Sequence, residues 1–309
     1  MSVFEQTLKR DGPVILDGGL ATQLESMGFD IRGDLWSASL LARGPRAIVE
    51  AHRAYLDAGA ECITSASYQA SSAGFMSQGY SRVESDHLVA SAAELALTAR
   101  EEFLAENPNV EFRPLVAASV GPYGATMHDG SEYTGNYNVS DDDLRHFHSE
   151  RLQLLDSGGA DVLAVETIPN LREAEILCDL LEAVVTPVWV SFCCRDEQSI
   201  SDGTPLRTAA ALFANHTRVL ATGVNCTSPR FISPLIEEIK AAAPDKAIVV
   251  YPNSGEMYHS AENSWSGKPC DLDADFTVNA WRAAGAKLIG GCCRTSPEDI
   301  GRIRRRLTE

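Results

Sequence analysis

The feature that most constrains the fold of this chain is a local pattern that occurs four times along it. In each copy the end of a helical stretch leads through a short turn, usually rich in Ala and Gly, into an apolar strand. The copies read YLDAGAECITSAS, LLDSGGADVLAVET, LFANHTRVLATGVNC and WRAAGAKLIGGCC. Such a turn between helix and strand is half of a βα unit, and its recurrence indicates repeated βα units with parallel strands.

Four further apolar runs bring the number of expected strands to eight, and they lie at 14–19, 114–121, 187–194 and 247–253. Helical patterns separate the strands, several opening on Pro or on a Ser or Asp cap: 45–58, 84–105, 141–156, 171–183 and 229–242. No Gly/Ser-rich linker or low-complexity tract divides the 309 residues. We therefore predict an α/β fold, a single-domain (β/α)8 TIM barrel over 1–309. A doubly wound open sheet is the alternative.

The charge and the termini of the sequence narrow the class of protein. A net charge of −17 argues against a nucleic-acid surface, which needs Lys and Arg to neutralise phosphates. The first residues, MSVFEQTLKRDGP, lack the apolar core of a signal peptide, and no run of about 18 apolar residues exists to span a bilayer. We expect a cytoplasmic protein that binds neither nucleic acid nor a membrane. A chain of this length needs no disulfide staples, so we expect its eight cysteines to be reduced.

Three cysteines directly follow predicted strands: Cys226 ends the run GVNC, and Cys292 and Cys293 end the run IGGCC. Active sites of TIM barrels lie at the C-terminal ends of the strands, where the sixth and eighth strands are two apart and their thiols can converge on one metal ion. Three protein ligands leave a fourth position for water or substrate. The alternative is that these are small buried apolar residues. Cys193 and Cys194 are assigned to packing, because three ligands are available without them.

Two carboxylates and two long loops are expected at the same end of the barrel. Asp17 in LDGG and Glu166 in VET both lie at strand ends. The loops 121–140 and 251–271 follow the third and seventh strands, and loops of this length in compact domains tend to be functional. The alternative for each loop is a solvated irregular segment.

Eight short segments of the chain are distinctive. They are LDGGLATQLE at 16–25, SASYQASSAGF at 65–75, SVGPYGA at 119–125, AVETIPN at 164–170, SDGTPL at 201–206, GVNC at 223–226, VVYPNSGE at 249–256 and IGGCCRTSPEDI at 289–300. In order and spacing they resemble the homocysteine S-methyltransferases over essentially the whole chain. The similarity is strongest to the branch that uses S-methylmethionine, and often S-adenosylmethionine, as methyl donor.

The resemblance implies a zinc enzyme that forms methionine from L-homocysteine and a sulfonium methyl donor. Its Zn²⁺ would be held by Cys226, Cys292 and Cys293, with the homocysteine sulfur in the open position. Soft thiolate ligands suit Zn²⁺, and a thiol that coordinates the metal is deprotonated and therefore nucleophilic.

The resemblance also implies roles for residues near these cysteines. Asp17 and Glu166 would bind the homocysteine ammonium, and Gly18 and Gly19 would let the backbone approach the amino acid closely. Taken alone, an Asp before Gly-Gly is more often a turn former. Asn225 has two equal interpretations, as a contact to polar groups of the substrate or as a brace for the strand end.

Three other functions are weighed against this one. A betaine-homocysteine methyltransferase would share the metal site and differ in its donor. A nonenzymatic zinc or thiol redox sensor is consistent with the cysteines but leaves DGG, VET and the long loops without a purpose. Metal-assisted hydrolysis usually employs His or carboxylate ligands, which the three-thiol set disfavours. We expect a monomer or a small homo-oligomer.

Overall fold

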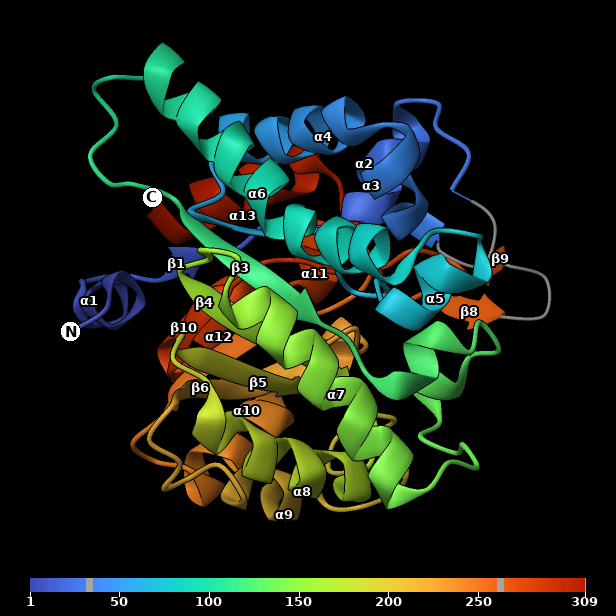
Figure 1. The fold of residues 1–309 in the computed structure, drawn as a ribbon. Coiled ribbons are helices and arrows are strands. Elements are labelled where there is room, and N and C mark those ends of the chain that lie inside the picture. The colour runs from blue at the N-terminus through green and yellow to red at the C-terminus, as the bar shows by residue number, and fades with distance from the viewer. Residues whose placement is uncertain (32–35, 260–263, 309) are drawn as a thin grey trace.

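The computed structural model describes residues 1–31, 36–259 and 264–308, and it forms a closed barrel of parallel strands surrounded by helices (Figure 1). The barrel strands are β1 (Val14–Ile15), β2 (Cys62–Thr64), β3 (Leu115–Val120), β4 (Val162–Ile168), β5 (Val188–Phe192), β6 (Val219–Asn225), β7 (Ala247–Tyr251) and β10 (Ala286–Ile289). Their order in the eight-stranded sheet is β1-β10-β7-β6-β5-β4-β3-β2, and each pair is parallel.

The sheet closes where the chain beyond β1 meets β2. Leu16 and Cys62 form a parallel bridge, and the Asp17 amide donates to the Cys62 carbonyl oxygen at 3.0 Å. Each of the eight predicted strands is present, and the predicted TIM barrel is confirmed. The open-sheet alternative is wrong, because these hydrogen bonds join the two edges that such a sheet would leave free.

Helices form the outer layer. The longer ones are α4 (Pro45–Asp57), α6 (Arg82–Glu106), α7 (Asp141–Asp156), α8 (Leu171–Leu180), α10 (Ile232–Ala242) and α13 (Pro297–Thr308). The shorter ones are α1 (Val3–Lys9), α2 (Leu20–Ser26), α3 (Ser39–Arg43), α5 (Ser72–Ser77), α9 (Leu206–Ala211), α11 (Leu272–Asp275) and α12 (Val278–Ala284). The 3₁₀ turns are η1 (Trp36–Ala38), η2 (Tyr123–Thr126), η3 (Ser131–Tyr133), η4 (Leu181–Ala183) and η5 (Pro229–Phe231). No helix in the described part of the chain is long and apolar enough to cross a bilayer.

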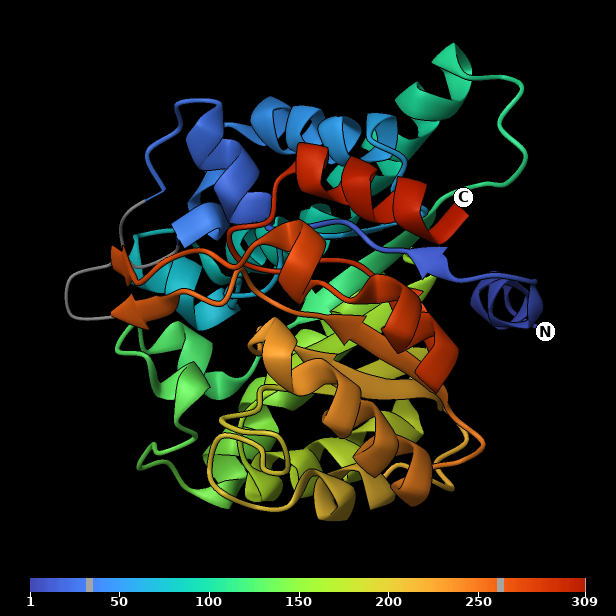
Figure 2. The ribbon, with the colours of Figure 1, turned by 180° about the vertical axis from the view of Figure 1, so that it is seen from behind.

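The barrel has two distinguishable ends. At one end α1 inserts Phe4 into the interior, where its ring lies 6.0 Å from that of Trp189. At the other side of the molecule lies an antiparallel hairpin of β8 (Met257–His259) and β9 (Ser264–Ser266), as both views show (Figure 2). At the C-terminal end of the chain, α13 packs against α4 in the helix layer (Figure 2).

Apolar side chains fill the barrel and the space between the strands and the helices. The interior cluster combines Trp189 with small residues such as Ala117, Ala164 and Ala221, so that one large ring fills the space that neighbouring strands leave. Residues that alternate with these along the strands, such as Val116 and Val190, face the helices instead.

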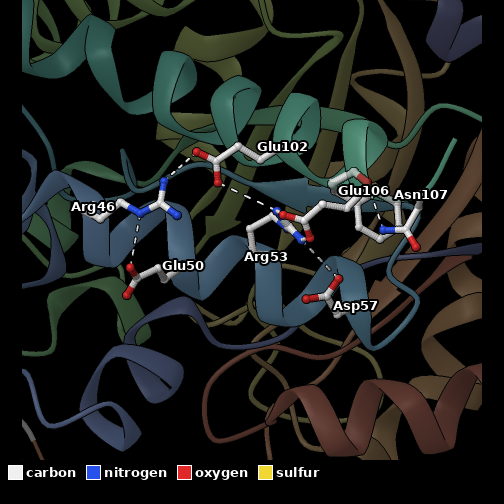
Figure 3. Close-up of polar contacts among 8 residues, drawn as sticks. Arg46, Glu50, Arg53, Asp57, Glu102, Glu106 and Asn107 are labelled. Carbon is white, nitrogen blue, oxygen red and sulfur yellow. Dashed lines mark hydrogen bonds and ion pairs between the residues drawn. The ribbon is translucent and has the colours of Figure 1, made fainter.

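Ion pairs on the outside of the helix layer join α4 to α6 (Figure 3). Arg46 pairs with Glu50 and Glu102, and Arg53 pairs with Glu106 and with Asp57. The acidic partners are about one-third exposed or more, so solvent screens these pairs and each contributes little to stability. The pairs of Arg46 with Glu102 and of Arg53 with Glu106 connect α4 to α6.

Gly223 allows β6 to pair closely with β7 and generates the first prediction. A Cβ added there would lie 1.7 Å from the Val249 carbonyl oxygen, which is backbone and cannot move aside. Gly223→Ala should therefore lower the free energy of unfolding by about 3 kcal/mol or more, measured by urea denaturation. The matched control is Gly301→Ala in α13, where the new Cβ meets only the Ala58 carbonyl oxygen at 3.6 Å. That variant should gain about 0.5–1 kcal/mol, and equal effects of the two substitutions would contradict the account.

Candidate metal and substrate site

Three sulfur atoms meet at the ends of β6 and β10, although they are far apart in the sequence. Cys226 directly follows β6, and Cys292 and Cys293 lie in the turn after β10, with β7 between the two strands. The three Sγ atoms all lie within 4.8 Å of one another, and the cluster could hold a metal ion. The barrel thus brings together the three cysteines that the sequence singled out.

Two of these cysteines are joined in the structure. Cys226 and Cys292 form a disulfide across 66 residues of sequence, and the Cys293 Sγ lies 3.5 Å from that of Cys226. The expectation that all eight cysteines are reduced is therefore wrong for this pair. The physical reason is proximity, since strand ends that hold three thiols near one point also place them within reach of a disulfide.

The backbone around the sulfur cluster is strained. Cys226, Thr167 and Arg294 have φ values of 46°, 62° and 66°, in the left-handed region that non-glycine residues rarely adopt. Each of these three residues follows the end of a barrel strand or a site residue. A backbone conformation of this kind raises the free energy of the folded state by about 1–3 kcal/mol per residue. Strain concentrated at one end of a barrel indicates that the chain is bent there to direct side chains inward.

Asn225 holds two of these strand ends together. Its Oδ1 accepts hydrogen bonds from the Thr167 amide at 2.7 Å and from the Ser191 hydroxyl at 2.8 Å, and its Nδ2 donates to the Thr167 hydroxyl at 2.7 Å. The residue is fully buried. Its amide is thus engaged within the protein, which favours the brace interpretation, while a direct substrate contact stays a prediction.

Glu166 precedes the strained Thr167 and its carboxylate is buried inside the barrel mouth. Its Oε1 accepts a hydrogen bond from the Ser119 hydroxyl, and its Oε2 accepts one from the Tyr251 hydroxyl at 2.9 Å. Burial raises the pKa of Glu166 above its ordinary value, and these hydrogen bonds oppose the shift only in part. Ser119 and Tyr251, which hold this carboxylate in place, were not predicted as its partners.

Asp17 is a second buried carboxylate, at the end of β1. Its Oδ2 accepts from the Thr64 amide at 2.7 Å and its Oδ1 from the Thr64 hydroxyl at 3.1 Å. Burial raises the pKa of Asp17 to about 8 against these two hydrogen bonds, and the Glu166 charge adds to the rise. The two carboxylates therefore influence each other and both favour a cationic neighbour.

Gly18 and Gly19 allow two backbone segments to approach each other closely. In the structure the segment that approaches them is the turn that carries Cys292. A Cβ on Gly18 would lie 2.6 Å from the Thr295 carbonyl oxygen, and one on Gly19 would lie 2.9 Å from that of Cys292. The Tyr55 hydroxyl donates a bifurcated hydrogen bond to the carbonyl oxygens of Gly19 and Thr295, each at 2.9 Å. The glycines thus bring Asp17 and Cys292 together, and their contact with substrate stays a prediction.

The thiols that remain free around the cluster are poor nucleophiles on their own. Burial raises the pKa of Cys293 to about 12 against a hydrogen bond from the Tyr133 hydroxyl, and burial raises the pKa of Cys193 to about 11. Cys193 and Cys194 are both buried, as expected for packing. A cation at the cluster would favour the ionised form of these sulfur atoms.

The loop 121–140 packs over β4 through its 3₁₀ turn η3. The buried side chain of Glu173 accepts hydrogen bonds from this loop. Glu173 of α8 accepts from the Tyr123 amide at 2.7 Å and from the Tyr137 hydroxyl, and it lies 2.7 Å from His148 Nε2. In both views this loop and the β8–β9 hairpin lie on the same side of the barrel. Of the second predicted loop, 251–271, positions 260–263 lie outside the described residues.

The brace formed by Asn225 generates the second prediction. Asn225→Ala removes the acceptor for a buried amide and a buried hydroxyl, so the free energy of unfolding should fall by about 3 kcal/mol. Asn107→Ala is the control, because the Asn107 side chain makes one hydrogen bond at a helix end, to the Phe103 carbonyl oxygen at 3.0 Å. The control should lose no more than about 1 kcal/mol in the same denaturation experiment. Equal losses would show that Asn225 does not brace the site.

Comparison with known proteins places this site in a family. A family model described as homocysteine S-methyltransferase matches residues 14–307. The chain is 45% identical to the homocysteine S-methyltransferase YbgG of Bacillus subtilis, covering 94% of this chain and 93% of that one. It is 47% identical to homocysteine S-methyltransferase 4 of Zea mays, covering 96% and 90%. The metallated form of the homocysteine methyltransferase MmuM from Escherichia coli superposes with a TM-score of 0.87 at 42% identity, covering 98% and 99% of the two chains. Its oxidised form gives 0.86 at 43% identity, covering 97% of each.

Proposed function

The chain belongs to the homocysteine S-methyltransferase family, and we propose that it uses Zn²⁺ to transfer a methyl group from S-methylmethionine to L-homocysteine, forming methionine. The observation that carries the proposal is the cluster of Cys226, Cys292 and Cys293, whose Sγ atoms lie within 4.8 Å of one another beside buried carboxylates. S-adenosylmethionine is the second donor, and betaine is the alternative.

The donor atoms of the cluster fit Zn²⁺ once the Cys226–Cys292 disulfide is reduced. Three soft sulfur ligands at one point match the preference of this ion, and three protein ligands are typical of catalytic zinc. Bound there, Zn²⁺ would supply the positive charge that turns the homocysteine thiol into a thiolate near neutral pH. Burial raises the pKa of the Cys293 thiol, so a cation at the cluster would favour its thiolate form.

Asp17 and Glu166 are proposed to bind the homocysteine ammonium. Both side chains are buried, and each accepts hydrogen bonds only from neutral groups among the described residues. An ammonium would add charge-assisted hydrogen bonds and favour the ionised form of both carboxylates, whose pKa values are raised by burial. The amino acid would then be held by its charge while its sulfur reaches the cysteine cluster.

The reaction itself is a displacement at the methyl carbon. A bond forms between the homocysteine sulfur and that carbon, the bond to the donor sulfonium sulfur breaks, and the electron pair stays on the donor sulfur. The thiol proton passes to solvent, so S-methylmethionine and homocysteine yield two molecules of methionine. The protein supplies orientation, for which the braced ends of β4 and β6 provide a rigid frame. We propose that residues 1–309 act as one barrel domain.

The proposed activity is tested by methionine formation with metal-analysed protein, homocysteine and each donor in parallel. Zinc-dependent turnover that is fastest with S-methylmethionine supports the proposal, and chelator-treated protein should be inactive. Turnover with betaine alone would favour the alternative donor. Zinc binding without any methionine would favour a thiol sensor, for which the Cys226–Cys292 disulfide would be the oxidised state.

Removal of a cluster cysteine generates the third prediction. Cys226→Ala, Cys292→Ala or Cys293→Ala should each abolish bound zinc and activity, measured by metal analysis and methionine formation, while circular dichroism remains that of a folded barrel. Cys178→Ala is the matched control, because that thiol lies on α8 and contacts the Leu212 carbonyl oxygen. It should keep both zinc and turnover. A cluster variant with full turnover would exclude the proposed metal site.

Substitution of Glu166 generates the fourth prediction. Glu166→Gln keeps the shape of the side chain and removes its charge, so the KM for homocysteine should rise about tenfold or more while the zinc content stays unchanged. Steady-state kinetics and metal analysis of the same preparation check both statements. Loss of zinc in this variant would mean that Glu166 supports the metal and not the amino acid.

A further inference from the structure

Glu132 is a third buried carboxylate beside the sulfur cluster, and the proposed mechanism gives it no role. It lies in η3 of the loop 121–140, and its side chain is 6% exposed. Its Oε2 atom is buried and has no hydrogen-bond partner among the described residues. The Asp129 carboxylate adds a charge of the same sign that also raises the pKa of Glu132. A buried acceptor in this condition requires an explanation, because desolvation without a partner is costly.

The surroundings of Glu132 place it at the site. Its turn, η3, packs against β4, the strand that carries Glu166. The next residue, Tyr133, hydrogen-bonds the Cys293 sulfur. Glu132 thus reaches the cluster from a loop, whereas Asp17 and Glu166 reach it from barrel strands.

The backbone holds Glu132 in this position. A Cβ added to Gly124 would lie 2.6 Å from the Glu132 amide nitrogen, so η2 and η3 pack directly against each other. The Gly135 amide donates to the Ser131 carbonyl oxygen at 2.8 Å, and the Gly135 carbonyl oxygen accepts from the Asn170 side chain at 3.3 Å. The backbone that carries the buried Glu132 side chain is therefore held in place by contacts within the loop and with Asn170.

The charges around Glu132 indicate what it binds. Asp17, Glu166 and Glu132 are buried near thiols that would be anionic when metallated, and burial raises the pKa of Glu132 to about 7. A ligand with positive charge would relieve this accumulation of acidic groups. S-methylmethionine carries two such charges, a sulfonium and an α-ammonium, and homocysteine carries one ammonium.

The chemistry of methyl transfer indicates which of the two positive charges of the donor a carboxylate can bind without slowing the reaction. A sulfonium has no hydrogen to donate to an unpartnered oxygen, and its charge disappears as the methyl group leaves. A carboxylate against it would therefore stabilise the reactants more than the transition state and slow the reaction. An ammonium donates up to three hydrogen bonds and keeps its charge throughout, so binding it lowers the KM without a penalty in kcat.

We propose that Glu132 binds the α-ammonium of the methyl donor and thereby selects amino-acid sulfonium donors over donors without an amino group. The inference rests on the proposed function, since it assigns the homocysteine ammonium to Asp17 and Glu166. The α-nitrogen of betaine is quaternary and has no N–H to donate, so Glu132 would discriminate against it, whereas S-methylmethionine and S-adenosylmethionine both carry an α-ammonium with three N–H donors.

The test compares wild-type and Glu132→Gln holoenzyme with two donors. One is S-methylmethionine, and the other is 4-(dimethylsulfonio)butanoate, which is the same molecule without its amino group. The variant should raise the KM for S-methylmethionine about 10- to 100-fold, change kcat by no more than about twofold, and leave the kinetics of the deaminated donor unchanged. The KM for homocysteine and the zinc content should also be unchanged. Glu132→Asp should recover part of the affinity, and the exposed Glu106→Gln is the control.

Three outcomes would overturn the inference. Equal losses with both donors would mean that Glu132 acts on the sulfonium or on the fold, and a rise confined to the KM for homocysteine would assign it to the acceptor. An unchanged dissociation constant for S-methylmethionine, measured by calorimetry on the zinc-loaded proteins, would overturn it independently of turnover. Failure of the proposed function is distinguishable, because it appears in the wild-type protein as an absence of methionine with every sulfonium donor.

Discussion

The site depends on three acidic side chains that are buried at one end of the barrel. Asp17, Glu132 and Glu166 are each at least nine-tenths buried, and burial raises the pKa of all three. Three sulfur atoms that would be anionic as metal ligands lie beside them. Burial favours the protonated form of these groups, and a cationic ligand would favour their ionised form. A divalent metal and the ammonium groups of amino acids have the required charge.

The hydrogen bonds and the apolar core of the barrel hold the strained backbone of this site in place. Strained residues at the ends of β4 and β6 would relax if the hydrogen bonds of Asn225 to Thr167 and Ser191 did not hold them. The fully buried apolar side chains inside and around the barrel supply the stability against which this strain is small. The same frame explains the Cys226–Cys292 disulfide, because it fixes the thiols close together whether or not a metal separates them.

The sequence predicts the barrel and the location of the site because both follow from local patterns. Each βα unit carries its own apolar run and turn, and the C-terminal end of a strand is visible where Cys226 or Glu166 stops the run. Glu132 and Tyr133 were not predicted, since their burial depends on the path of a long loop over β4. The packing of Gly18 and Gly19 against the Cys292 turn was also hidden, because it joins segments from opposite ends of the chain.

Zinc K-edge X-ray absorption on the reduced, zinc-loaded protein, with and without homocysteine, tests the central claim most directly. The account predicts a sulfur count of three at the metal in the free protein, from Cys226, Cys292 and Cys293, and of four when homocysteine is added. A count that stays at three would contradict it, because the substrate sulfur would then bind elsewhere. A count of four before homocysteine is added would also contradict it, since the site would have no open position.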